Sequence, residues 1–138
     1  MSRKKLFIYT DGAARGNPGP AGIGARILDS DGNVLSEECQ YIGEATNNVA
    51  EYRALLMGLE RAAELGASTV EVRSDSELVV KQLRGEYRVR SVALRDLFER
   101  AKQLSRAFQS VDYVHVRREL NRDADRLANR AIDARRGG

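Results

Sequence analysis

Four acidic residues stand in sequence contexts that could build a metal site: Asp11, Glu51, Asp75 and Asp125. Asp11 follows an alternating apolar run and Asp75 follows a short β-branched run, so we expect both at the ends of strands. Glu51 stands at the start of one predicted helix and Asp125 in the first turns of another, each at the flank of an apolar stripe, which places their carboxylates at the rim of the core. The predicted topology brings all four to one edge of one sheet. The sequence therefore predicts a preorganised site on rigid elements.

The kinds of ligand available predict which ion this site would hold. Carboxylate oxygens suit Mg²⁺ or Mn²⁺, whereas a single histidine, His115, and a single cysteine, Cys39, leave too few soft ligands for zinc. Two ions about 4 Å apart can activate a water and stabilise the leaving oxygen of a phosphodiester. Phosphodiester hydrolysis is therefore the expected chemistry.

Each acid also has an ordinary structural explanation. Asp11 precedes a glycine and could begin an Asp-Gly turn. Glu51 stands three residues after Asn48 and could close a helix-capping arrangement with it.

The other two acids can be explained in the same way. Ser74 and Glu77 have the capping spacing, which would leave Asp75 as an ordinary first-turn acid. Asp125 lies in the first turns of a helix capped by Asn121, where a negative charge is favourable in any protein. Taken singly, these explanations are favoured over catalysis, and only the conjunction of the four acids favours a site.

The hydrophobic periodicity predicts an α/β fold. The expected elements are strands at 6–11, 24–28 and 34–41, a helix at 52–63 closed by Gly66, a strand at 69–73, helices at 77–83 and 92–107, a strand at 111–117 and a helix from 121 to about 135. A turn at 30–33 joins the second and third strands. This order predicts a five-stranded mixed sheet, with three antiparallel strands and then two parallel ones, and with helices on both faces.

Length and composition limit the class of protein. The 138 residues suit one core, so we expect a single domain over 1–138. A lone cysteine excludes an internal disulfide and favours the reducing cytoplasm. The apolar run before Asp11 is too short for a signal peptide, and no stretch approaches a membrane span. We expect a cytoplasmic monomer that does not associate with membranes; the net charge of +3 does not by itself indicate nucleic acid.

The four acids lie within longer motifs. These are TDGAARGNPGP at 10–20, TNNVAEY at 46–52, RSDSELVV at 73–80 and NRDADRLA at 121–128. In order and approximate spacing they resemble type 1 ribonuclease H over essentially the whole chain. The resemblance implies a ribonuclease H-like fold and an endonuclease that cuts the RNA strand of RNA–DNA hybrids, leaving 5′-phosphate and 3′-hydroxyl ends.

The resemblance also implies a role for each acid. Asp11 would bridge two Mg²⁺ or Mn²⁺ ions bound with the substrate, Glu51 and Asp75 would share one side, and Asp125 would complete the other. Glu51 would also accept a hydrogen bond from a ribose 2′-hydroxyl. DNA strands lack this hydroxyl, which would explain why they are not cut. The sequence leaves open which ion is preferred and whether double-stranded RNA is a further substrate.

Four polar residues fall at positions that meet the substrate in the family: Asn17, Thr46, Asn47 and Gln82. Thr46 would belong to a phosphate pocket on the DNA strand, and the other three would meet sugars or bases. The alternatives are turn formation for Asn17, helix capping for Thr46 or Asn47, and plain solvation for Gln82. The arginine of the family's phosphate pocket falls here on Leu28. Arg26 is expected on the opposite face of the strand and is a poor substitute.

A basic segment follows the third acid. It holds Lys81, Arg84, Arg88, Arg90 and Arg95, with Tyr87 among them and Glu86 as its acid. We predict that Lys81, Arg84 and Arg88 help to hold a phosphate backbone, with a solvated surface as the alternative. Longer family members carry a basic helical protrusion and a tryptophan here, so this chain resembles the compact form.

The last part of the chain differs from longer family members, which place a histidine on a loop before the final helix. That connection is only about 118–120 here, and the lone His115 lies within the preceding strand, where we favour an ordinary strand role. Arg118 and Glu119 directly precede the helix that carries Asp125. A carboxylate there could shuttle protons or recruit metal, and a guanidinium could hold the scissile phosphate.

Arginine also recurs every four residues at 118, 122, 126 and 130. We interpret this repeat as a solvent face paired with nearby acids.

Two other functions remain open. One is a nuclease or transposase relative with the same fold, against which the combined motifs argue. The other is a non-catalytic hybrid-binding module, against which the presence of all four acids argues.

Overall fold

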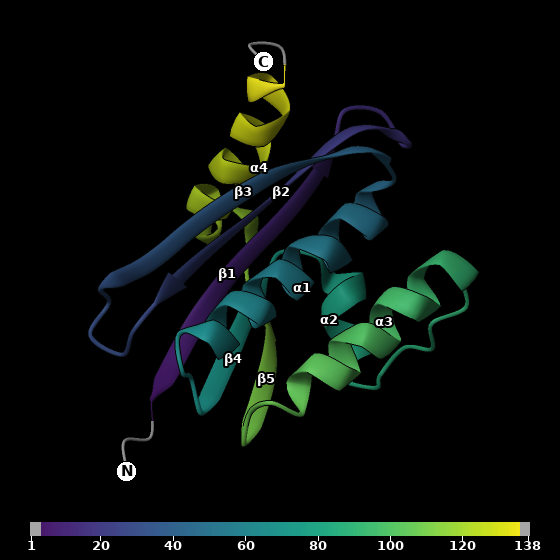
Figure 1. Ribbon diagram of the computed structural model, residues 1–138. Coiled ribbons are helices and arrows are strands. Elements are labelled where there is room, and N and C mark those ends of the chain that lie inside the picture. Colours follow the sequence, from purple (N-terminus) through teal and green to yellow (C-terminus); the bar gives the residue numbers. More distant parts are fainter. Residues whose placement is uncertain (1–3, 136–138) are drawn as a thin grey trace.

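The computed structural model describes residues 4–135 and contains one five-stranded mixed sheet (Figure 1). The strand order is β3-β2-β1-β4-β5, and the bounds are β1 Lys5–Ala14, β2 Gly19–Leu28, β3 Val34–Ala45, β4 Thr69–Ser74 and β5 Ser110–His115. The first three strands are antiparallel, whereas β4 runs parallel to β1 and β5 runs parallel to β4. The predicted α/β sheet is confirmed.

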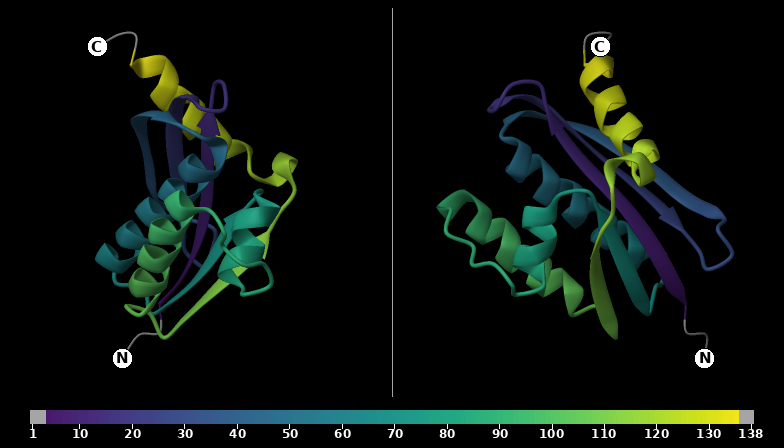
Figure 2. Two further views of the ribbon diagram at one scale, coloured as in Figure 1. Left: turned by 90° about the vertical axis from the view of Figure 1, so that its right-hand side faces the viewer. Right: turned by 180° about the vertical axis from the view of Figure 1, so that it is seen from behind.

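Helices cover both faces of the sheet. Three lie on one face, α1 Asn47–Glu64, α2 Glu77–Leu83 and α3 Val92–Ser105, and α4 Arg122–Ala134 lies on the other (Figure 2). A short 3₁₀ turn, η1 Arg118–Leu120, joins β5 to α4. Within residues 4–135, no helix combines the length and the apolar character that crossing a bilayer requires.

The first three strands are longer than predicted. β1 does not end at Asp11, because β2 begins at Gly19 and the two strands stay paired from Asp11↔Gly24 to Ala14↔Ala21. The expected strand end at Asp11 is therefore wrong, and so is the Asp-Gly turn. Glycine and proline between residues 16 and 24 favour a loop when read from sequence, yet most of this stretch is extended and paired.

The main core lies between the sheet and α1. It is formed by fully buried side chains of the strands and the helix: Leu6, Ile8, Val70, Val72, Tyr52, Leu55 and Leu59. The helix begins earlier than predicted because Thr46 caps it, with its Oγ1 accepting from the Val49 N–H at 3.2 Å. Gly66, at φ +81°, follows the helix end as expected.

Two glycines allow helices to approach the strands closely. A Cβ built on Gly12 would lie 2.2 Å from the carbonyl carbon of Ala50, so α1 crosses β1 almost in backbone contact. On the other face, a Cβ on Gly24 would lie 2.6 Å from the carbonyl oxygen of Ala124 in α4. Both approaches bring the first turn of a helix next to β1 or β2, and these first turns carry Glu51 and Asp125.

Replacing Gly12 by alanine should destabilise the fold strongly, because the new methyl group meets backbone that cannot move aside. We expect a loss of more than about 3 kcal/mol in the free energy of unfolding, measured with urea. Gly32→Ala is the control: its Cβ meets nothing within 4 Å, and only its φ of +85° is unfavourable. The control should cost about 1–2 kcal/mol. Equal losses in the two variants would contradict the close crossing.

Candidate metal centre

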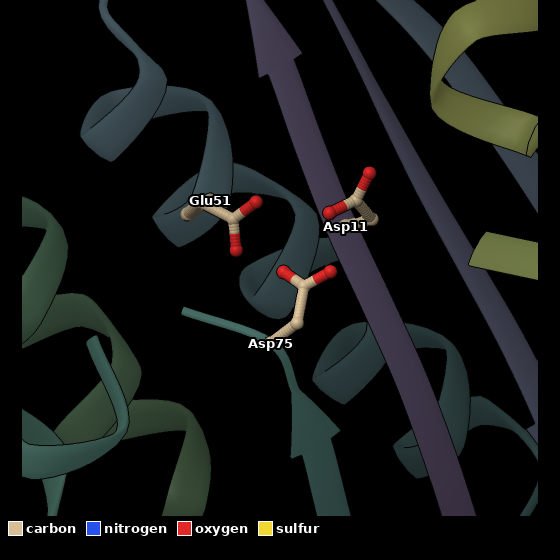
Figure 3. Close-up of side chains that lie close together, drawn as sticks. All are labelled: Asp11, Glu51 and Asp75. Carbon is tan, nitrogen blue, oxygen red and sulfur yellow. The ribbon is translucent and has the colours of Figure 1, made fainter. Parts of the chain in front are cut away.

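Three carboxylates converge where β1 extends beyond β4. The pairing of β1 with β4 ends at Thr10↔Ser74, and the residue that follows each of these in sequence is an acid, Asp11 or Asp75. Glu51 reaches the same point from the first turns of α1, and Figure 3 shows the three carboxylates directed toward one another. One oxygen from each lies within 4.8 Å of the others. A single cation could therefore contact all three.

Glu51 is held by two hydrogen bonds from the strands. Its Oε1 accepts from the Gly12 N–H at 2.8 Å, and its Oε2 accepts from the Ser74 hydroxyl at 3.3 Å. The side chain is turned away from Asn48, so the predicted capping arrangement is wrong. Neither Gly12 nor Ser74 is predicted from sequence as a partner of Glu51, although each directly neighbours a predicted metal ligand.

Asp75 is not a first-turn acid of α2, as its ordinary structural explanation would require. Ser76 caps α2, with its Oγ accepting from the Val79 N–H at 3.4 Å. Ser74 instead accepts from the Ser76 N–H at 3.1 Å, so the predicted pairing of Ser74 with Glu77 is wrong. Asp75 therefore precedes the cap and faces the other acids.

Asp125 approaches the centre from the α4 side. It lies outside the group of three but is in hydrogen-bonding contact with Asp11. Asn129 Nδ2 donates to its Oδ1 at 3.2 Å. Asp11 thus interacts with all three of the other acids.

Burial and like charge make this cluster costly without a counter-ion. Burial is the largest cause that raises the pKa of Asp11, and the charges of Glu51 and Asp75 and a hydrogen bond with Asp125 raise it further. Burial also raises the pKa of Glu51, although the Gly12 N–H opposes the rise. An all-oxygen donor set with excess negative charge fits a hard divalent cation.

The predicted substrate residues near α1 form one connected group. Asn17 Oδ1 accepts from the Asn47 N–H at 3.1 Å, and Asn47 Oδ1 accepts from the Ala14 N–H at 3.0 Å. Both asparagines are exposed, and their oxygens tie the β1–β2 turn to the start of α1. Helix capping by Thr46 is confirmed, and capping by Asn47 is wrong because Asn47 is the first residue of α1. Substrate contact by the three residues stays a prediction.

Gln82 is not a solvated residue. Its side chain is 4% exposed, and its Oε1 accepts from the Tyr52 hydroxyl at 2.6 Å. Because Tyr52 follows Glu51 and lies fully buried on α1, this bond ties α2 to the helix that carries the acid. A direct substrate contact by Gln82 stays a prediction.

Arg26 does not lie on the face opposite Leu28. The two residues are two apart on β2 and line the same hollow together with Tyr9, because side chains alternate between faces along a strand. The Arg26 guanidinium is held by Asp123 on α4 and by Glu37 on β3 at 3.2 Å. These two acids, rather than the direction of the side chain, make Arg26 a poor phosphate ligand.

More of the basic side chains in this segment are paired with acidic side chains than the sequence suggests. Lys81 lies 2.9 Å from Glu77, and Arg84 lies 2.9 Å from Glu86. Lys81 Nζ also lies 5.0 Å from the ring centre of Tyr87. Arg88 is exposed. Binding to phosphates by Lys81, Arg84 and Arg88 stays a prediction.

The arginine repeat faces solvent as expected, since residues 118, 122, 126 and 130 are all exposed. Arg126 lies 3.0 Å from Asp123 and 3.9 Å from Glu37. This bears out the predicted pairing with acids for Arg126.

The residues considered for the role of the loop histidine of longer family members lie on β5 and η1. Arg118 and Glu119 are exposed on η1, and Glu119 lies 3.7 Å from Arg117. His115 is the last residue of β5, aligned with Ser74 on β4. The pKa of Glu77, the first residue of α2, is lowered mainly by Lys81 and to a smaller extent by His115. Catalytic roles for Arg118 and Glu119 stay predictions.

Comparison with known proteins decides the family. A ribonuclease H of Prosthecochloris aestuarii is 34% identical over 94% of this chain and 97% of its own length. The chain belongs to the ribonuclease H family. The family profile described as "Reverse transcriptase-like" matches residues 9–131.

Two further similarities concern the fold and the length of the chain. The structure of LC11-RNase H1 in complex with an RNA/DNA hybrid is 48% identical, with a TM-score of 0.90 and coverage of 94% of this chain and 97% of that one. A bifunctional protein of Mycobacterium tuberculosis is 49% identical over 94% of this chain. This ribonuclease H family chain spans only 36% of that relative's length.

The stability of the metal-free protein should fall as the pH rises from about 5 to about 8. The pKa values of Asp11 and Glu51 are raised in the folded state, so over this range the unfolded chain binds fewer protons than the folded one, and the free energy of unfolding decreases. Asp11→Asn removes one buried charge and should flatten this decline. In EDTA at pH 8 the variant should be at least about 1 kcal/mol more stable than the wild type.

Urea unfolding at several pH values in EDTA measures this effect. Asp96→Asn, which removes an exposed carboxylate on α3, should keep the wild-type slope. An Asp11→Asn variant that is less stable than the wild type at pH 8 without metal would contradict the proposed repulsion.

Proposed function

We propose that this chain is a metal-dependent endoribonuclease that hydrolyses the RNA strand of RNA–DNA hybrids, leaving 5′-phosphate and 3′-hydroxyl ends. The observation that carries the proposal is the convergence of Asp11, Glu51 and Asp75 within 4.8 Å where β1 extends beyond β4. The similarity to LC11-RNase H1, whose structure holds an RNA/DNA hybrid, supports the substrate.

The four acids would divide the binding of two cations between them. Asp11 is grouped with Glu51 and Asp75 and also interacts with Asp125 of α4, so its carboxylate would serve both positions. When bound, two Mg²⁺ or Mn²⁺ ions would neutralise the scissile phosphate and supply Lewis acidity for its in-line hydrolysis. The protein contributes the fixed positions of the carboxylates, which are set by strand and helix backbone before any ligand arrives.

Recognition of ribose would fall to Glu51. Each of its oxygens already accepts one hydrogen bond, from Gly12 and from Ser74. A carboxylate oxygen can accept a second hydrogen bond. The carboxylate is thus fixed in orientation while still able to accept from a 2′-hydroxyl, which a DNA strand lacks.

The two exposed asparagines would contact the hybrid without reading its sequence. Because the side-chain oxygens of Asn17 and Asn47 are bound to backbone N–H groups, their NH₂ groups are the donors left for a ligand. In a minor groove, purine N3 and pyrimidine O2 are acceptors on every base pair. Thr46, at the same helix start, would add a phosphate contact on the DNA strand.

Removing one of the central negative charges should abolish cleavage. Asp11→Asn and Asp75→Asn preserve side-chain shape but remove a cation ligand, which should cost several kcal/mol of transition-state stabilisation, or at least about a hundredfold in kcat. Steady-state cleavage of one hybrid at saturating Mg²⁺ measures the loss, with Asp96→Asn as the matched control. Either variant retaining more than about a tenth of wild-type turnover would overturn the assignment.

The basic segment should act mainly on substrate binding. Replacing Lys81, Arg84 and Arg88 together by alanine should raise KM more than it lowers kcat, and should flatten the dependence of KM on salt, because fewer counterions are released on binding.

The control for this variant is Arg61→Ala. Arg61 lies in the last turn of α1, far along the helix from Glu51, and it pairs with Glu38 at 3.5 Å and Glu64 at 3.6 Å. Its loss should leave the salt dependence unchanged. A fall in kcat at constant KM in the triple variant would show that the segment does not hold the substrate.

A further inference from the structure

Asn121 is a buried polar residue that the proposed chemistry leaves unused. It is 1% exposed and stands at the N-cap position of α4, yet its side chain makes no capping hydrogen bond. Its Nδ2 instead donates to the Thr10 carbonyl oxygen at 2.9 Å, across 111 residues of sequence. The predicted capping of α4 by this side chain is therefore wrong, and the amide joins the helix start to β1.

Thr10 lies on β1 where the pairing with β4 ends. It is the last residue of β1 that is paired with β4, and the next residue is Asp11. The Asn121 amide thus holds β1 where the support from β4 ends. Asp11 follows directly and stays paired with Gly24 on β2, so this hydrogen bond fixes the start of α4 relative to a strand that is already held in the sheet.

The backbone of Asn121 makes the second connection. Its carbonyl oxygen accepts from the Asp125 N–H at 3.1 Å, which forms the first turn of α4. One residue therefore bonds to the strand beside Asp11 through its side chain and to Asp125 through its main chain. The contact between the two carboxyls spans this same junction.

We propose that Asn121 is a positioning residue that sets the separation of Asp11 and Asp125 and thereby builds the cation position between them. This inference rests on the proposed function for its catalytic consequence. The other cation position, between Asp11, Glu51 and Asp75, is held by the separate bonds from Gly12 and Ser74 to Glu51. Loss of Asn121 should therefore weaken one position and leave the other in place.

Other contacts keep α4 on the sheet when the Asn121 amide is removed. Ala124 packs against Gly24, and Asp123 pairs with Arg26 near the start of the helix. Arg15 pairs with Asp133 near its end at 2.8 Å. We therefore expect replacement of Asn121 to shift the first turn of α4 rather than release the helix.

The test compares Asn121→Ser with the wild type in two kinds of measurement. Serine is a good N-cap residue but is too short to reach the Thr10 carbonyl. Without substrate, the rise in melting temperature caused by MnCl₂ should be smaller in the variant. With a hybrid substrate, the Mg²⁺ concentration for half-maximal rate should rise about tenfold, and KM for the hybrid should change by less than about twofold.

Two further variants make the test specific. In an Asp125→Asn background, Asn121→Ser should have little additional effect on kcat or on the Mg²⁺ dependence, because both changes act on one cation position. Ser91→Ala removes the cap of α3, where Ser91 Oγ accepts from the Leu94 N–H at 3.4 Å. It should lower stability without changing the Mg²⁺ dependence. If Asn121→Ser does not fold, Asn121→Thr replaces it, since threonine is also an accepted N-cap residue and is too short to donate to the Thr10 carbonyl.

The outcomes separate this inference from the proposed function. An Asn121 variant with unchanged Mn²⁺ stabilisation and unchanged Mg²⁺ dependence would overturn the inference, as would an undiminished effect in the Asp125→Asn background. A wild-type protein that cleaves no hybrid would overturn the proposed function instead. The Mn²⁺ stabilisation measured without substrate would still decide the role of Asn121.

Discussion

The close crossing of α1 over β1 at Gly12 is the constraint on which the site depends. Because no side chain separates the two backbones there, the Gly12 N–H can donate to Glu51 at 2.8 Å and bring that carboxylate beside Asp11. The buried face of α1, with Tyr52 and Leu55, keeps the helix pressed on the sheet. Hydrophobic packing thus holds together carboxylates that would otherwise move apart, and the energy of the core maintains the charge density that a divalent cation requires.

The same arrangement places the acids away from the hollow along α3 and β5. A hollow of about 770 Å³ lies along α3 and β5, and none of the four acids lines it. The acids lie instead at the edge where β1 extends beyond β4, with exposed Asn17 and Asn47 nearby on the β1–β2 turn and the start of α1. Under the proposed function this edge would receive a long polymer that continues past the reacting phosphate in both directions, whereas an enclosed pocket would suit a small molecule.

Much of the fold follows from local sequence signals, and the site follows from motifs. The helical spacing of Leu55 and Leu59 identifies a helix, and Gly66 marks its end. The Ser-Asp-Gly-Asn turn identifies a hairpin. These signals need little information from tertiary structure. The full extent of β1 and β2 could not be predicted in this way, because Gly12 on β1 and Gly22 on β2 are extended by their neighbours rather than by their own preference. The hydrogen bonds to Glu51 and from Asn121 to Thr10 join residues far apart in sequence, so only the assembled sheet shows them.

The central claim is that these carboxylates serve a cation-dependent cut in the RNA strand of a hybrid. The most direct measurement is cleavage of one RNA–DNA hybrid labelled separately on each strand, with MgCl₂ or with EDTA, and with the matching DNA duplex alongside. The account predicts RNA fragments with 5′-phosphate ends in Mg²⁺, an intact DNA strand, an intact DNA duplex and no cleavage in EDTA. RNA cleavage that persists in EDTA, cutting of the DNA strand, or an uncut hybrid at saturating Mg²⁺ would contradict it.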